Sequence, residues 1–132
     1  MPDILAPTLE QIEALAQAAF DSLPEHFVRN VKDVLIRVEE FPDAETEREM
    51  ELDSPFDILG LYRGSSIAGR EGSNPSPFPD MIHLYRRPIL DYWCETGEEL
   101  AHVVRHVLIH EIGHHFGLSD DDMEAIERQM PD

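Results

Sequence analysis

The chain of 132 residues carries 10 basic and 28 acidic side chains, for a net charge of −18. This balance argues against nucleic acid or an anionic membrane surface as a partner, because such partners are bound through basic patches. The length and a hydrophobic content of 42% predict one globular domain that spans residues 1–132.

The cysteine content and the N-terminal residues bear on the cellular location of the protein. The sole cysteine, Cys94, cannot form an internal disulfide, which favours a reducing, cytoplasmic location. Beside Trp93 it is expected to be a buried, small apolar residue. Residues 1–4 lack the basic segment of a signal peptide, and no stretch approaches the roughly 20 apolar residues of a membrane span.

The first half of the chain alternates between helical and extended patterns. Thr8 and Gln11 have the spacing of a capping box, and apolar residues then recur at helical intervals until Pro24. Further along, apolar and polar residues alternate with the period of a strand. The elements expected here are a helix from Thr8 to about Ser22, a short helix over residues 25–30, a strand around 34–38, an acidic helix over 43–50 and a strand over 58–63.

The second half is expected to hold a loop, a strand and three helices. Glycine, proline and serine are concentrated between Gly64 and Asp80, which predicts an irregular loop, either a surface connection or a cover over a cleft. The elements that follow are a strand over 81–85, a short helix over 88–93 opened by Pro88, a long helix over 98–116 closed by Gly117, and a last helix over 120–130.

One stretch carries specific chemistry: residues 110–120 read His-Glu-Ile-Gly-His-His-Phe-Gly-Leu-Ser-Asp. On a helix, positions i and i+4 share a face, so His110 and His114 can direct two imidazoles at one metal ion. Two neutral imidazoles suit zinc. Glu111 is rotated by about 100° from them, so it flanks the metal as a general base. The pattern predicts zinc-dependent hydrolysis.

The third metal ligand is chosen among nearby carboxylates. Gly117 can adopt a positive φ and end the helix, which lets the chain turn and bring Asp120 back to the histidines. Three protein ligands and one open position characterise a catalytic zinc site. Alternatively, Asp120 is only a first-turn acid of a helix capped by Ser119. We favour Asp120 as the ligand, with Glu124 second and Glu127 a formal candidate.

Histidines recur every four residues along the same helix. Each step rises about 6 Å, so alternate members start about 12 Å apart, whereas ring nitrogens must lie about 2 Å from zinc. One zinc ion therefore takes one adjacent pair, which the rest of the motif identifies as His110 and His114. We expect His106 to be a wall of the site or a residue that supports the ligands, and His102 to be a polar surface residue. His115 could be a hydrogen-bonding neighbour of the site, and we favour a solvent-facing position for it.

These residues resemble the zincin superfamily and, more narrowly, the small bacterial minimal-zincin family of zinc metallopeptidases. The resemblance extends over nearly the whole chain: the first helix, the Leu59–Tyr62 strand, the proline-rich loop, the Ile82–Tyr85 strand and the motif over 110–118. It implies a compact α+β fold, the minimal zincin-like fold, with a small mixed sheet packed against the motif helix. It also implies His110, His114 and Asp120 as zinc ligands and Glu111 as the base.

The chain departs from one branch of that superfamily in two ways. Metzincins commonly have a third histidine where this chain has Asp120, so a carboxylate changes the ligand set. They also have a methionine turn beneath the metal. Met123 follows Asp120 too closely for that role and is expected in the core of the last helix.

The expected activity is hydrolysis of peptide or protein substrates. Zinc would activate water and polarise the carbonyl while Glu111 accepts the proton from the water. An extended peptide would pair with an edge strand, for which residues 81–85 are the candidate. The oxyanion is expected to be stabilised by one of four side chains, Tyr62, Tyr85, His83 or His106.

Two other function classes stay open at this point. A metal-binding or protein-interaction module without protease activity is compatible with a chain this short. A metal-dependent hydrolase of another class, such as a nuclease, could also use two spaced histidines. The charge of −18 counts against the nuclease.

Overall fold

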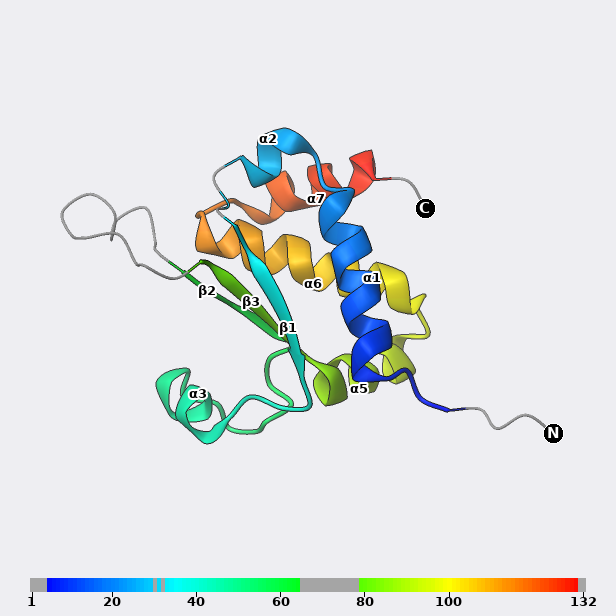
Figure 1. Cartoon of the computed structure of the whole chain (residues 1–132), viewed down its shortest axis with the longest axis vertical. Helices are drawn as coiled ribbons and strands as arrows, with labels where there is room; N and C mark the ends of the chain where they lie inside the picture. The colour runs from blue at the N-terminus through cyan, green and yellow to red at the C-terminus, as the bar shows by residue number, and fades with distance from the viewer. Residues whose placement is uncertain (1–4, 30, 32, 65–78, 131–132) are drawn as a thin grey trace.

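The computed structural model describes residues 5–29, 31, 33–64 and 79–130, which form helices and strands in an α+β arrangement (Figure 1). This confirms the predicted fold class. The elements are α1 (Leu9–Asp21), α2 (Glu25–Val28), β1 (Leu35–Glu39), α3 (Ala44–Glu49), β2 (Gly60–Arg63), β3 (Met81–Tyr85), α5 (Arg86–Thr96), α6 (Leu100–His115) and α7 (Asp120–Gln129). The predicted loop over 64–80 lies mostly outside the described residues.

The three strands form a mixed sheet in the order β1-β3-β2. β3 pairs in parallel with β1 and antiparallel with β2, so it is the central strand. The prediction that residues 81–85 offer a free edge to substrate is therefore wrong. Among the described strands, β1 and β2 lie at the edges (Figure 1). Strand order depends on tertiary pairing, which the local pattern of each strand does not encode.

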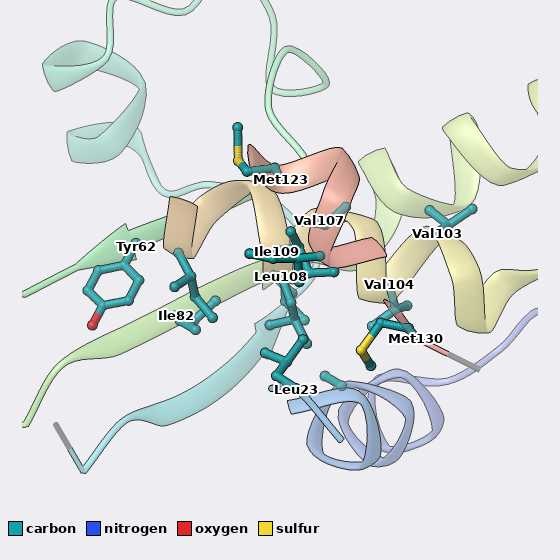
Figure 2. Packing of buried hydrophobic residues seen from close by; sticks show 14 of the residues in the cluster. Leu23, Tyr62, Ile82, Val103, Val104, Val107, Leu108, Ile109, Met123 and Met130 are labelled. Atoms are coloured by element: carbon teal, nitrogen blue, oxygen red, sulfur yellow. The ribbon is translucent and has the colours of Figure 1, made fainter. Parts of the chain in front are cut away.

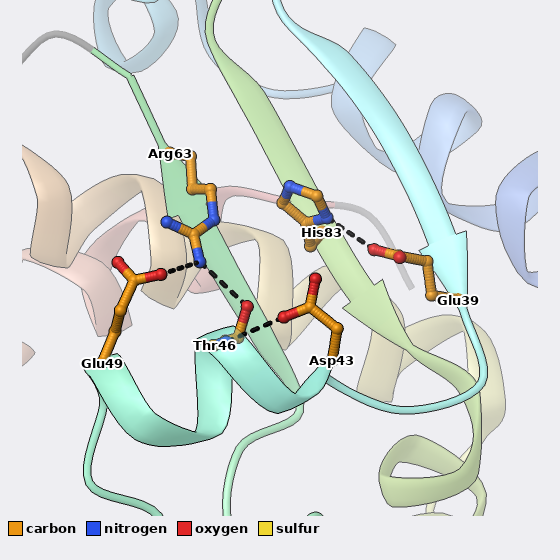
Figure 3. A network of polar contacts seen from close by, with 6 residues as sticks. All are labelled: Glu39, Asp43, Thr46, Glu49, Arg63 and His83. Carbon is orange, nitrogen blue, oxygen red and sulfur yellow. Dashed lines mark hydrogen bonds and ion pairs between the residues drawn. The ribbon is translucent and has the colours of Figure 1, made fainter.

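The two faces of the sheet differ in chemistry because side chains alternate along each strand. On β3, Ile82 and Leu84 are completely buried and belong to the core that α6 covers. His83 points to the other face, where α3 lies (Figure 3). The sheet thus separates an apolar core from a polar network.

Helix α1 begins as the sequence predicts. The Thr8 side chain accepts from the backbone N–H of Gln11, and the Gln11 side chain accepts from the backbone N–H of Thr8. This capping box satisfies two N–H groups that a helix start leaves unpaired. The helix buries Ile12 and Ala16 against α6 and β1.

Helix α6 is buried on several sides and forms the centre of the core (Figure 2). Its buried residues are Val103, Val104, Val107, Leu108, Ile109, Ile112 and Gly113. It ends in a Schellman motif: Gly117 has a φ of 76°, its N–H donates to the His114 carbonyl, and the Leu118 N–H donates to the Gly113 carbonyl. The predicted end of the helix at Gly117 is confirmed.

Helix α7 starts immediately after that turn and packs on α6. Its N-cap Ser119 forms a capping box with Asp122, as the sequence indicated for Ser119. Met123 is completely buried, which confirms its predicted place in the core.

Two further expectations concern the surface. Cys94 is exposed, so its prediction as a buried residue is wrong; it lies near the end of α5 on the solvent side of that helix. Within the part of the chain that the structure describes, no helix has the length and apolar character needed to cross a membrane.

Candidate metal centre

The end of α6 and the start of α7 bring the three predicted ligands together. His110 and His114 lie one turn apart, with ring centroids separated by 5.6 Å. Asp120 is the first residue of α7, and the Gly117 turn directs it back toward them. Ligand atoms of the three residues all lie within 4.8 Å of one another. Ser119 caps α7 as well, so the capping role and the position of Asp120 beside the histidines coexist.

His110 is the least exposed of the three candidate ligands. Its Nε2 atom is buried and has no hydrogen-bond partner within the described residues. Burial is the main cause that lowers the pKa of His110, and the neighbouring His106 acts in the same direction. A lowered pKa favours the neutral imidazole, whose free lone pair is the form that binds a metal ion.

Glu111 occupies a different environment beside the same histidines. Burial raises the pKa of its carboxyl from 4.5 to about 7. The backbone N–H of Tyr62 donates to this carboxyl and lowers its pKa in part. A carboxyl with a pKa near neutrality can both accept and release a proton at physiological pH.

An open cleft of about 470 Å³ adjoins Glu111 and His114. Its lining residues come from β2, from the segment before β2 and from the end of α6: Met50, Ile58, Gly60, Leu61, Tyr62, Glu111, His114 and His115. Gly60 lets β2 approach α6, because a Cβ there would lie 2.9 Å from Cγ1 of Val107 and 3.0 Å from the His83 carbonyl oxygen. The cleft therefore runs between an edge strand and the motif helix.

Tyr62 and His115 form one wall of this cleft. Their rings stack with centroids 4.0 Å apart, and the Tyr62 hydroxyl donates to the buried Asp80 carboxylate. The favoured expectation, that His115 faces solvent, is thus wrong, and the residue is instead a neighbour of the site. Sequence reasoning missed this role because a residue directly after a ligand on a helix points off the ligand face, where only the tertiary position of β2 provides a partner.

Two of the predicted oxyanion-stabilising residues lie elsewhere. His83 pairs with Glu39 at 2.6 Å on the face of the sheet that bears α3 (Figure 3). Tyr85 lines a cavity with His83 on that face, and burial, reinforced by Glu39, raises its pKa to about 12. The expectation for His83 and Tyr85 is wrong, because the alternation along β3 directs both away from α6.

A second cluster joins the histidine series to α7. His106 Nδ1 lies 2.7 Å from Oε1 of Glu127, and His110 Nε2 lies 3.3 Å from the same oxygen. The second contact is within ion-pair distance but lacks hydrogen-bond geometry. Ligand atoms of His106, His110 and Glu127 also lie within 4.8 Å of one another, whereas Glu124 is exposed and belongs to neither group.

A family model described as a zincin-like metallopeptidase matches residues 31–130. No curated protein matches. A solved structure of a conserved hypothetical protein from Thermo thermophilus is similar, with 22% sequence identity, a TM-score of 0.51 and coverage of 92% of this chain and 99% of that one. At this identity the likeness bears on the fold alone.

Proposed function

Since the chain belongs to the zincin-like metallopeptidase family, we propose that it is a zinc-dependent peptidase. The proposal assigns His110, His114 and Asp120 as the metal ligands and Glu111 as the general base. One observation carries it. The three proposed ligands lie together, and one of them, His114, lines an open cleft with a carboxyl whose pKa is raised to about 7.

The donor set fits zinc. Two imidazole nitrogens and one carboxylate oxygen are ligands that zinc takes in hydrolytic sites. The buried Nε2 of His110 has no hydrogen-bond partner within the described residues, and a bound cation would satisfy it. Bound zinc would act as a Lewis acid and lower the pKa of water. Asp120 and His114 are exposed, which leaves a side of this position open to water and substrate.

The residues of the chain then account for the proton transfers. The Glu111 carboxylate would accept a proton from the attacking water and deliver it to the nitrogen of the leaving amine. Its pKa near 7 suits both steps. The Tyr62 N–H orients the carboxylate from β2, and His115 lines the same cleft with its ring stacked on that of Tyr62.

The cleft favours an extended peptide as substrate. β2 has one side without a partner strand among the described residues, so a peptide could pair along it. Met50, Ile58 and Leu61 provide an apolar lining for one side chain of that peptide. The net charge of −18 favours substrates that are not themselves strongly acidic.

The decisive experiment compares Glu111→Gln with the wild type. We expect the zinc-loaded variant to cleave a mixed pool of unstructured peptides more slowly by about 10²-fold or more, because it lacks the base. Zinc stoichiometry should stay unchanged, since Glu111 is not a ligand.

Glu124→Gln is the matched control, because Glu124 is an exposed glutamate of α7 outside both ligand groups. It should retain wild-type rates. Wild-type cleavage by Glu111→Gln would disprove the assigned base. A wild type that binds one zinc ion and cleaves nothing would favour a metal-binding module.

A further inference from the structure

We propose that His106, His110 and Glu127 form a second metal position, which competes with the first for a single divalent ion such as zinc. The first position is the His110, His114 and Asp120 group. The second position needs no peptidase activity, and its existence does not depend on the function proposed above.

The second position is built from two packed elements. His106 and His110 are adjacent members of the histidine series on α6, with ring centroids 4.0 Å apart. Glu127 reaches them from the third turn of α7, and Met123 and Ile126 anchor that helix in the core. The Glu127 side chain is 29% exposed and the His110 side chain 23% exposed, whereas the His106 side chain is 47% exposed, so the second position is open to solvent on the His106 side.

The contacts among these three side chains leave one buried ring nitrogen, His110 Nε2, without a hydrogen bond to any described residue. Oε1 of Glu127 faces both histidines, at 2.7 Å from His106 Nδ1 and 3.3 Å from His110 Nε2. The buried His110 Nε2 still makes no hydrogen bond to any described residue. A cation between the three side chains would bind this nitrogen, and two histidines with one carboxylate are a zinc-type donor set.

Sharing of His110 makes the two positions exclusive. A neutral imidazole has one unprotonated ring nitrogen, so His110 can bind one ion at a time. The wild type should therefore bind one zinc ion per chain, distributed between the two positions. Neither His106 nor Glu127 lines the cleft that Glu111 and His114 line, so an ion at the second position would lack His114, the ligand that borders the cleft.

Zinc binding to paired variants of the full chain tests the proposal. His114→Ala/Asp120→Ala removes the first position and should still bind about one zinc ion per chain in equilibrium dialysis. It should also show a zinc-dependent rise in Tm, since a ligand that binds only the folded state stabilises it. Adding His106→Ala/Glu127→Ala should abolish both signals. His102→Ala/Glu124→Ala, a histidine of α6 and a glutamate of α7 outside both groups, is the matched control and should bind as the wild type does.

The outcomes distinguish failure of the second metal position from failure of the proposed peptidase function. Circular dichroism must show that each variant is folded. If folded His114→Ala/Asp120→Ala binds no more zinc than the fourfold variant, the second position is disproved. If His106→Ala/Glu127→Ala loses all zinc while His114→Ala/Asp120→Ala keeps it, the second position stands and the ligand set of the peptidase is wrong.

Discussion

The backbone N–H of Tyr62 on β2 donates to the Glu111 carboxyl on α6. This bond ties the edge strand to the motif helix at the cleft. Burial nevertheless outweighs it, because the pKa of Glu111 is raised to about 7 despite the donor. The environment of the proposed base therefore favours its neutral form until the pH approaches neutrality, and this has a consequence for stability that can be measured without metal.

The free energy of unfolding of the metal-free protein should decrease as the pH rises, because Glu111 has a raised pKa in the folded state. Below pH 4.5 the carboxyl is protonated in both the folded and unfolded states. Between 4.5 and about 7 the unfolded state releases the proton while the folded state keeps it, so a rise in pH favours unfolding by up to about 1.4 kcal/mol per unit. Glu111→Gln lacks this dependence. Urea unfolding with a chelator should therefore show that the stability of Glu111→Gln, relative to that of the wild type, increases from pH 4.5 to pH 8.

Glu124→Gln controls for the loss of one negative charge, since Glu124 is exposed. Its stability relative to the wild type should change much less over the same range. If the difference in unfolding free energy between Glu111→Gln and the wild type is the same at pH 4.5 and at pH 8, the raised pKa is contradicted.

Gly113 allows α6 and α7 to pack closely. A Cβ at this position would lie 2.2 Å from Sδ and 2.7 Å from Cγ of the completely buried Met123. Overpacking costs about 1–3 kcal/mol, and the better helix propensity of alanine offsets about 1 kcal/mol. Gly113→Ala should therefore lower the free energy of unfolding, as measured in urea, by up to about 2 kcal/mol.

A double-mutant cycle identifies the cause. Met123→Ala is itself destabilising because it leaves a cavity. In that background the Gly113→Ala change should be neutral or stabilising, since the sulfur no longer opposes the new methyl group. Additive effects of the two changes would show that the contact is not responsible.

Gly117 and Gly97 permit a test of the turn that returns Asp120. Both have positive φ, 76° and 70°, and a Cβ on either would meet nothing within 4 Å. Alanine at either site should cost about 1–2 kcal/mol of stability through backbone strain alone. Only Gly117→Ala should weaken zinc binding in a chelator competition, because only this turn positions a ligand. Equal zinc affinity in the two variants would mean that the turn does not set the ligand geometry.

Local patterns predicted what local physics determines. The capping box at Thr8, the Schellman end at Gly117 and the one-turn spacing of His110 and His114 each depend on a few neighbouring residues. The edge position of β2, the stacking of His115 on Tyr62 and the contact of Glu127 with His106 depend on how distant elements pack. The histidine series did indicate adjacent pairs, but only the placement of α7 gives His106 and His110 a shared carboxylate.

The apolar wall of the cleft should set a substrate preference. Met50 lines the cleft with Ile58 and Leu61, and 45% of its surface stays exposed. Under the proposed peptidase activity, cleavage should favour peptides with an apolar side chain near the scissile bond. Met50→Glu should lower kcat/KM for such peptides by about 10-fold, mainly through KM, because lost apolar contact weakens ground-state and transition-state binding alike. Leu35→Glu changes an exposed apolar residue of β1 outside the cleft; if it reduces kcat/KM as much, the effect is one of charge and the cleft does not select the side chain.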